Sequence, residues 1–254
     1  MYAKIETDIS YNYLKKLVSK LNEPIIIIGG WAVYLTVNKN YTAEHGSNYI
    51  GSRDIDLGFD SLDSLIETSN VLEKNGFKLI SFRYVKEIDY ETGKELTKDE
   101  SKDLPQYNIF SMYVDLLVSK IPKDTLAKLG FIPADEPFIE GVFVDSTKRQ
   151  ELVEFNRKLW LPSCEILLLT KINSVINRSQ DHKKTKDFCN IVALLLYSGK
   201  SPNELISFIH LNVNKDTLFK FKSNISEQTI KDISNILHIT PSIISKLFIE
   251  IYTI

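Results

Sequence analysis

The stretch IIIIGG at residues 25–30 constrains the fold of this chain more than any other feature. Four β-branched residues between Pro24 and a glycine favour a short strand that is covered on both faces. The two glycines allow a tight turn with unusual backbone dihedral angles, and WAVYLTV after them can form a helix. The sequence therefore predicts a buried strand, a sharp turn and a helix in direct succession.

A second strand is predicted about twenty residues later, where RDIDLGFD alternates acidic and apolar residues. Residues i and i+2 of a strand project from the same face, so Asp54 and Asp56 stand side by side on its wet face. Two carboxylates this close repel each other. They are tolerated if water screens them, if one is protonated, or if divalent cations bind between and around them.

A third carboxylate, Asp115, interrupts the apolar stretch MYVDLLVS. An unpaired aspartate in such a strand is costly to bury. The cost becomes reasonable if this strand lies next to the one that carries Asp54 and Asp56. Three carboxylates can hold two Mg²⁺ ions, which is the arrangement that stabilises the attacking and leaving oxygens of a displacement at phosphorus. We therefore predict a two-Mg²⁺ site that transfers a nucleotide.

The predicted turn at Gly29 and Gly30 fits the same chemistry. Glycine backbone has no Cβ to keep a ligand away, so its N–H groups can approach phosphate oxygens. The following helix adds the favourable dipole of its N-terminus. Because Mg²⁺ prefers a few carboxylates together with substrate phosphate oxygens, a nucleoside triphosphate is the predicted substrate.

The remaining pattern predicts an α+β protein in two parts. Helical texture dominates after Pro162, so we predict a catalytic domain at 1–160 and a helical domain at 161–254. The other elements expected in the first part are helices at 9–22 and 61–76, strands within 77–88, 106–120, 140–145 and 157–163, and a loop at 38–49. The run of mixed charges at 86–103 is typical of a solvated loop or hairpin tip, with a binding arm as the alternative.

The order of the predicted elements and their glycine and aspartate motifs resemble the polymerase-β-type nucleotidyltransferase superfamily. The resemblance lies in a strand ending at Gly29-Gly30, a helix, the strand with Asp54-Ile55-Asp56-Leu57, and a later strand with Asp115. GGWA is similar to the antibiotic nucleotidyltransferases. GSRDIDL followed by the helical LLLTKIN resembles uncharacterised and toxin–antitoxin nucleotidyltransferases. The resemblance covers residues 25 to about 118 well, covers 160–195 loosely, and does not extend to 200–254.

The resemblance implies a nucleotidyltransferase fold, a mixed sheet flanked by helices, followed by a helical domain that closes over the nucleotide. It implies that Gly29 and Gly30 contact the triphosphate and that Asp54 and Asp56 bind both metal ions. It further implies that Asp115 binds the catalytic ion and helps to deprotonate the acceptor hydroxyl. Two features depart from the family pattern: the longer connection at 31–53, and Gly30 where many relatives have serine. Neither departure removes a metal ligand.

Several polar residues are weaker candidates. Ser52 either contacts a phosphate or a metal-bound water, or is a turn residue before the strand. Arg53 either neutralises phosphate charge or pairs with a neighbouring acid. By the family likeness Lys171 binds the triphosphate, and Arg178 is on roughly the same helix face; the alternative is a solvated basic face. By the same likeness, the basic-then-acid pair at 186–187 is a candidate for nucleotide contact and helix positioning.

Composition limits the partners. With 31 basic and 33 acidic residues the net charge is −2, so no global field attracts nucleic acid or an anionic membrane. DNA is therefore not expected as a partner, and the acceptor is a small hydroxylated molecule, an RNA end or a protein side chain. The N-terminus lacks a signal-peptide pattern, which predicts a cytoplasmic protein. Cys164, Cys189 and the scattered histidines predict neither a disulfide framework nor a zinc site.

Two other enzyme classes place aspartates one residue apart. A haloacid-dehalogenase phosphatase needs its nucleophile at the end of an apolar strand, and here GSRD opens the strand. A sugar-nucleotide glycosyltransferase needs a larger α/β half before the pair. The non-catalytic alternative is a nucleotide-sensing or DNA-binding regulator, because 230–248 has the cadence of a helix-turn-helix. Its second helix offers the single basic residue Lys246, which favours helical packing over DNA contact.

Overall fold

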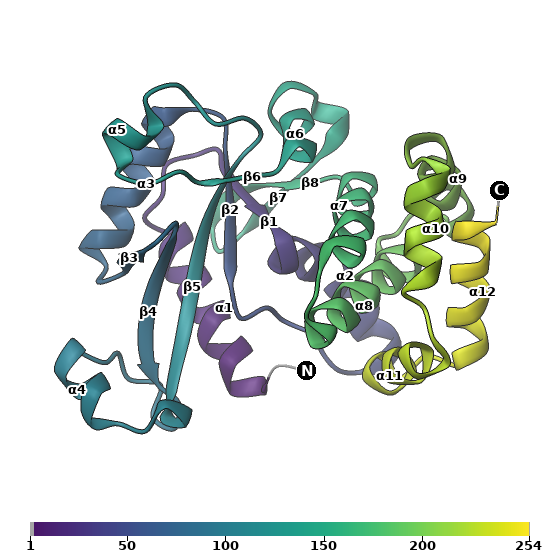
Figure 1. Cartoon of the computed structure of the whole chain (residues 1–254), viewed down its shortest axis with the longest axis horizontal. Helices are drawn as coiled ribbons and strands as arrows, with labels where there is room; N and C mark the ends of the chain where they lie inside the picture. Colours follow the sequence, from purple (N-terminus) through teal and green to yellow (C-terminus); the bar gives the residue numbers. More distant parts are fainter. Residues whose placement is uncertain (1–2, 254) are drawn as a thin grey trace. The chain divides into compact units, whose positions relative to one another are not determined.

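The computed structural model describes residues 3–253 and shows an α+β protein: a mixed sheet flanked by helices, and a helical C-terminal region (Figure 1). The described chain forms two compact units. The sheet unit comprises the chain up to Trp31 together with Gly51–Pro162. The helical unit comprises Ala32–Ile50 together with the chain from Ser163 onward. The predicted division assigned residues 32–50 to the first domain, whereas here they group with the helical unit.

The sheet unit contains an eight-stranded sheet in the order β3-β4-β5-β2-β1-β8-β7, with β6 beside β5. Its strands are β1 (Ile25–Ile28), β2 (Ile55–Phe59), β3 (Lys78–Ile80), β4 (Arg83–Asp89), β5 (Ile109–Val118), β6 (Ala134–Asp135), β7 (Arg149–Glu154) and β8 (Arg157–Pro162). Its helices are α1 (Lys4–Val18), α3 (Leu62–Lys74), α4 (Lys98–Asp103), α5 (Thr125–Leu129) and α6 (Glu140–Val144), with 3₁₀ turns at Gln106–Asn108, Pro137–Ile139 and Ser146–Lys148. Helix α2 (Gly29–His45) begins in this unit and continues into the helical unit.

The predicted strand at 25–28 is confirmed as an inner strand of the sheet. All four isoleucines of β1 are buried. The strand pairs with β2 antiparallel on one side and with β8 parallel on the other, so both of its edges are hydrogen-bonded. Because all four side chains are buried, both faces of β1 are covered. A strand covered on both faces has no wet face for polar residues, which explains the uninterrupted apolar run.

The two faces of the sheet carry different residues. Helices α1 and α3 cover one face, where Tyr84 of β4 hydrogen-bonds Glu73 of α3 and Lys86 lies near the ring of Tyr13 of α1. The opposite face, here called the site face, carries Asp56 and every second residue of the neighbouring strands. Part of the site face is covered by a cluster in which Ile26 and Ile28 of β1 pack with Ile139 and Val142.

The region 77–88, predicted as one strand, is instead the β3–β4 hairpin. Ile80 pairs with Arg83, so Ser81 and Phe82 form a two-residue turn. Ser81 adopts the left-handed backbone conformation with φ of 59°. The turn lacks the Asn-Gly or Asp-Gly pair that is the strongest sequence signal of such a hairpin. The apolar pattern alone therefore predicted one continuous strand.

Residues 140–145 were predicted as a strand, and this prediction is wrong: they contain helix α6. A strand would place Val142 and Val144 on one face. In the structure Val142 is fully buried together with Ile139, three residues earlier, whereas Val144 is 79% exposed. The burial of i and i+3 rather than i and i+2 is the helical pattern.

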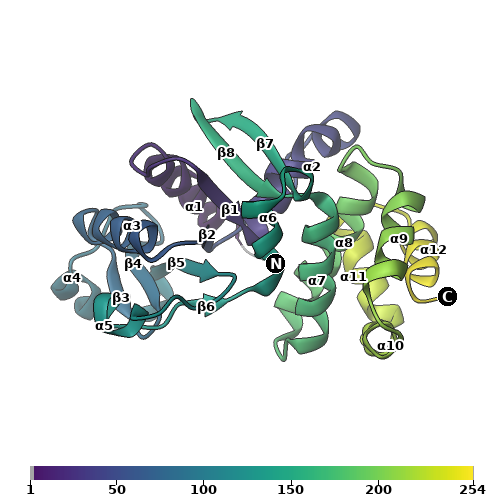
Figure 2. The ribbon, with the colours of Figure 1, turned by 90° about the horizontal axis from the view of Figure 1, so that it is seen from above.

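The strand β7 was not predicted. It pairs antiparallel with β8, and the two strands form the hairpin labelled in Figure 2. Phe155 and Asn156 make the turn with φ of 56° and 59°. Asn156 is a common residue at a left-handed position, but Phe155 is unusual there, and the turn has no Asn-Gly or Asp-Gly pair to mark it in the sequence.

The predicted loop at 38–49 is wrong for most of its length, since α2 continues to His45. Tyr41 is buried, donates a hydrogen bond to the carbonyl oxygen of Leu237 at 3.2 Å, and packs its ring against Tyr197. Tertiary contacts within the helical unit therefore hold a helix that the polar sequence of this segment did not reveal.

The helical unit contains α7 (Cys164–Asn177), α8 (Asp181–Tyr197), α9 (Pro202–Asn212), α10 (Lys215–Ser223), α11 (Glu227–Leu237) and α12 (Pro241–Tyr252). Three phenylalanines from α8, α10 and α12 form its aromatic core: Phe188, Phe221 and Phe248 lie with ring centroids 5.4 to 5.8 Å apart. No helix within residues 3–253 combines the length and apolar character that crossing a bilayer requires. Cys164 and Cys189 are buried free thiols.

Replacing Phe221 with alanine is expected to lower the free energy of unfolding by about 3–5 kcal/mol, because it empties the centre of this aromatic core. Phe219, on the same helix, is 72% exposed and is the matched control. Its replacement by alanine should change stability by less than about 0.5 kcal/mol. Urea denaturation of both variants measures the difference, and equal losses would contradict the assigned core.

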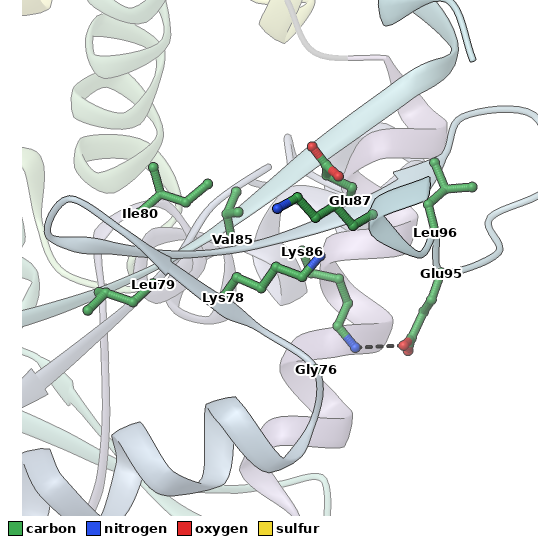
Figure 3. A pocket seen from close by; sticks show the side chains of 10 residues that line it. Gly76, Lys78, Leu79, Ile80, Val85, Lys86, Glu87, Glu95 and Leu96 are labelled. Atoms are coloured by element: carbon green, nitrogen blue, oxygen red, sulfur yellow. Dashed lines mark hydrogen bonds and ion pairs between the residues drawn. The ribbon is translucent and has the colours of Figure 1, made fainter. Parts of the chain in front are cut away.

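The charged segment 86–103 is anchored to the sheet unit rather than fully solvated. Lys86 is only 5% exposed; its Nζ donates to the carbonyl oxygen of Asn75 and, at 2.7 Å, to Glu95. Glu95 also accepts a 2.5 Å hydrogen bond from Tyr13 of α1. The dashed line in Figure 3 marks the ion pair of Lys86 with Glu95, beside a hollow of about 320 Å³ on the β3–β4 hairpin. Prediction of a solvated loop therefore fails at Lys86 and Glu95.

The pH dependence of stability should reveal this anchor. Burial raises the pKa of Glu95, but hydrogen bonds from Lys86 and Tyr13 outweigh burial and leave the pKa below its ordinary 4.5. A carboxyl with a lowered pKa stabilises the fold above its ordinary pKa and loses this effect as pH falls through the lower value. The stability difference between the wild type and Glu95→Gln should therefore be largest at neutral pH and shrink below pH 4.5. Denaturation as a function of pH tests it, with exposed Glu91→Gln as the control expected to show no such trend.

Candidate functional site

The register of three adjacent strands brings charged residues together on the site face. Asp56 of β2 lies directly opposite Asp115 of the parallel strand β5. On the other side of β5, Arg83 of β4 lies opposite the same Asp115. Residues paired in register project from the same face of a sheet, so the three side chains form one row. Asp54 precedes β2 by one residue and also reaches this row.

Arg83 is the centre of the contacts in this row. Its Nε donates to Asp115 Oδ1 at 2.5 Å and its Nη2 donates to Asp115 Oδ2 at 2.7 Å, which is a bidentate pair. The same Nη2 lies 3.4 Å from Asp54 Oδ2. The guanidinium also stacks on Tyr113 of β5, with Cζ 4.1 Å from the ring centroid. One guanidinium therefore joins two of the three predicted catalytic carboxylates.

The electrostatics of the row favour a charged guanidinium. Partial burial works to lower the pKa of Arg83, but the hydrogen bonds and charge of Asp115, together with the charges of Asp54 and Asp56, raise it above its ordinary value. Arg83, Asp54 and Asp115 are each about one quarter exposed, so water still reaches them. The three carboxylates and one guanidinium make a row that is negative overall and accessible to a cationic ligand.

Gly29 lies against the carboxylate of Asp56. Its φ is +64°, a left-handed conformation that favours glycine. A Cβ added to Gly29 would lie 1.8 Å from Oδ2 and 2.7 Å from Cγ of Asp56. The register explains the contact, since Ile28 pairs with Asp56 and Gly29 follows directly. The predicted phosphate-binding turn and a predicted metal ligand are therefore immediate neighbours, and Gly30, buried as the second residue of α2, follows them.

Ser52 and Arg53 lie in the loop before β2. Ser52 is only 4% exposed, and its proposed contact with a phosphate or a metal-bound water stays a prediction. Nη2 of Arg53 lies 3.5 Å from Oε1 of Glu6 on α1. Its Cζ lies over the ring of Phe110, 5.1 Å from the ring centroid. Of the two interpretations of Arg53, pairing with a neighbouring acid is the contact that the structure contains.

In the helical unit, Lys171 is part of a buried ionic cluster. Its Nζ donates to Asp187 Oδ1 at 3.0 Å, and Nε of Arg178 lies 2.5 Å from Asp187 Oδ2. Asp187 is 2% exposed, so both cations serve a carboxylate that would otherwise be buried without compensation. These pairs account for the charges of Lys171 on α7, of Asp187 on α8 and of Arg178, which directly follows α7. Nucleotide binding by Lys171, and by Lys186, which is also buried, stays a prediction.

The donor chemistry of the site suits Mg²⁺. Carboxylate oxygens are hard ligands, and Asp54, Asp56 and Asp115 supply three such groups on one face. As the side chains stand, however, no group of three or more His, Cys, Asp or Glu residues within 3–253 is arranged to hold a metal ion. The guanidinium of Arg83 lies among the carboxylates instead. The residue types fit the ion, and Arg83 is paired with two of the three carboxylates, Asp54 and Asp115.

Arg83 and Tyr113 are the residues that sequence analysis missed. Tyr113 was detectable, since it lies two residues before Asp115 and so on the same face of the strand. Arg83 was not, because its position opposite Asp115 depends on the two-residue turn at Ser81-Phe82. A shift of one residue in that turn would direct the guanidinium to the opposite face of the sheet.

No protein-family model matches the sequence, and no curated protein matches it significantly. Among solved structures, the chain is similar to an antigenic nucleotidyltransferase-like protein from Paracoccidioides brasiliensis. The sequences are 18% identical, the TM-score is 0.43, and the superposition covers 96% of this chain and 92% of that one.

Replacing Gly29 with alanine tests the contact with Asp56. Gly46 is the matched control, because its φ of +68° is similar but nothing lies within 4 Å of an added Cβ. Gly46→Ala should cost about 1–2 kcal/mol for the left-handed backbone alone. Gly29→Ala should cost about 1–3 kcal/mol more, since the Asp56 side chain must also move. Denaturant unfolding measures both, and equal costs would show that Asp56 does not occupy this space.

Proposed function

We propose that this chain is a nucleotidyltransferase that transfers a nucleoside monophosphate from a nucleoside triphosphate to an acceptor hydroxyl and releases pyrophosphate. The observation that carries the proposal is the register that places Asp56 opposite Asp115 while its carboxylate lies against Gly29. A phosphate-binding turn beside a row of carboxylates suits a substrate that is both a phosphate ester and a metal ligand. The resemblance of the motifs to the polymerase-β-type superfamily agrees with this chemistry.

The chain's own residues divide the work in this proposal. The backbone N–H groups after Gly29 and Gly30, at the N-terminus of α2, bind phosphate oxygens and orient the triphosphate. Asp54, Asp56 and Asp115 would hold two Mg²⁺ ions, which supply positive charge that stabilises the developing negative charge at phosphorus. Asp115 favours loss of the proton from the acceptor hydroxyl. Partial exposure of these carboxylates leaves the row accessible to the substrate.

The acceptor belongs to one of three classes: a small hydroxylated molecule, an RNA end or a protein side chain. The net charge of −2 weighs against long nucleic acid, because such binding depends on neutralising many phosphates. A role in a toxin–antitoxin pair, a cytoplasmic location and the binding of ATP stay predictions. The helix-turn-helix-like tail does not favour a regulator, because its second helix, α12, carries the single basic residue Lys246, whereas DNA contact needs several basic side chains on that face.

Label transfer tests the proposal. Incubation with each α-labelled nucleoside triphosphate, Mg²⁺ and the three acceptor classes should label one acceptor and release pyrophosphate. Asp56→Asn and Asp115→Asn should each lower the rate by at least about 10³-fold, since each removes a negative ligand needed for charge stabilisation at phosphorus. Asp99→Asn, which changes an aspartate with a 91% exposed side chain on α4, is the control and should keep full activity.

One outcome would contradict the assigned site, and another would contradict the function itself. The first is full activity of Asp56→Asn, which would exclude the site. The second is tight binding of a specific DNA with no label transfer to any acceptor, which would favour the regulator.

A further inference from the structure

A cation is built into the row of aspartates at the position opposite Asp115. Arg83 is fixed by the register of β4 on β5, by its two hydrogen bonds to Asp115, and by stacking on Tyr113. Its second carboxylate contact, to Asp54, places the guanidinium between β5 and the start of β2. Three independent kinds of contact thus hold the same group, so its position is a property of the sheet and not of a flexible surface side chain.

The sheet needs this cation when no other is bound. Aspartates directly opposite each other on neighbouring strands destabilise a sheet, and Asp54 adds a third negative charge. Arg83 offsets that repulsion by pairing with the carboxylates. Both oxygens of Asp115 are used in this pairing, so a metal ion that is to bind Asp115 has to compete with the guanidinium for the same oxygens.

We propose that Arg83 is an internal counter-cation that competes with divalent ions for the aspartate row, so that metal binding requires the guanidinium to leave Asp115. This inference rests on the proposed function, because it takes the three aspartates as metal ligands. It assigns Arg83 a positioning role: the residue keeps the carboxylates paired in the metal-free protein and sets how strongly a divalent ion must bind to enter.

The same reasoning explains why the side chains as they stand do not form a metal cage. The guanidinium is bound to both oxygens of Asp115 and lies 3.4 Å from Asp54 Oδ2, so it occupies the place between these carboxylates that a shared metal ion would need. Two positive charges within a few ångströms repel each other. The metal ion and the Arg83 guanidinium therefore weaken each other's binding to the three carboxylates. Removing the charge of Arg83 should therefore strengthen metal binding while weakening the metal-free fold.

The test measures Mn²⁺ binding to the whole protein without nucleotide, using electron paramagnetic resonance of free Mn²⁺. Arg83→Gln should bind Mn²⁺ at least about tenfold more tightly than the wild type, because the competing charge is gone. Without divalent ions, Arg83→Gln should also have a lower melting temperature than the wild type. Added Mg²⁺ should raise its melting temperature by more than it raises that of the wild type. Arg149→Gln is the matched control, because Arg149 also pairs with a carboxylate, Glu151, and stacks on an aromatic ring, Trp160, elsewhere in the sheet unit. That variant should bind Mn²⁺ like the wild type.

A second variant keeps the test decisive if Arg83→Gln does not fold. Tyr113→Leu retains the charge but removes the ring that holds the guanidinium, so it should tighten Mn²⁺ binding by about threefold, consistent with the modest strength of a partly exposed stacking contact. Equal or weaker Mn²⁺ binding by a folded Arg83→Gln or Tyr113→Leu, with binding abolished in Asp56→Asn, would overturn the competition while leaving the metal site intact. Absence of Mn²⁺ binding in every variant and in the wild type would overturn both this inference and the proposed metal site.

Discussion

The parallel pairing of β2 with β5 is the constraint on which the rest of the site depends. It places Asp56 and Asp115 opposite each other on one face, where two negative charges alone would weaken the sheet. Pairing of β4 on the far side of β5 adds Arg83 in the same row and offsets the repulsion. The carboxylates of the candidate site therefore also affect the stability of the sheet. Their mutual repulsion has to be offset by a positive charge, which Arg83 supplies.

The close packing of β1 against β2 makes the same point at the glycine turn. Ile28 pairs with Asp56, so the chain leaves β1 at the level of the carboxylate and has room only for a residue without a side chain. The positive φ of Gly29 then starts α2 with its N-terminus beside that carboxylate. An apolar strand, a glycine turn and a helix thus place backbone N–H groups next to acidic side chains, a combination that would suit a metal–phosphate substrate.

Several elements were predictable and others were not, for identifiable reasons. The strands at 25–28 and 55–59 and the helical region after Pro162 follow from strong local periodicity. The β3–β4 and β7–β8 turns contain no glycine, and Ser81 and Phe155 adopt left-handed conformations that are uncommon for residues other than glycine, asparagine and aspartate. The helical state of 38–45 depends on packing within the helical unit, to which Tyr41 contributes. Lys86 and Glu95 could not be distinguished from the solvated charges around them without their partner on α1.

The sequence by itself determined the chemistry that is available: two aspartates one residue apart, a third in an apolar strand, and a double glycine after a buried strand, because spacing and residue type are local properties. Only the tertiary structure decided which of these groups meet and what balances them. The register of the hairpin strand β4 on β5 places Arg83 beside Asp115. The packing of α7 against α8 places Lys171 within hydrogen-bonding distance of Asp187. Such pairings join residues distant in the chain, and their energies arise only when the sheet and the helices have assembled.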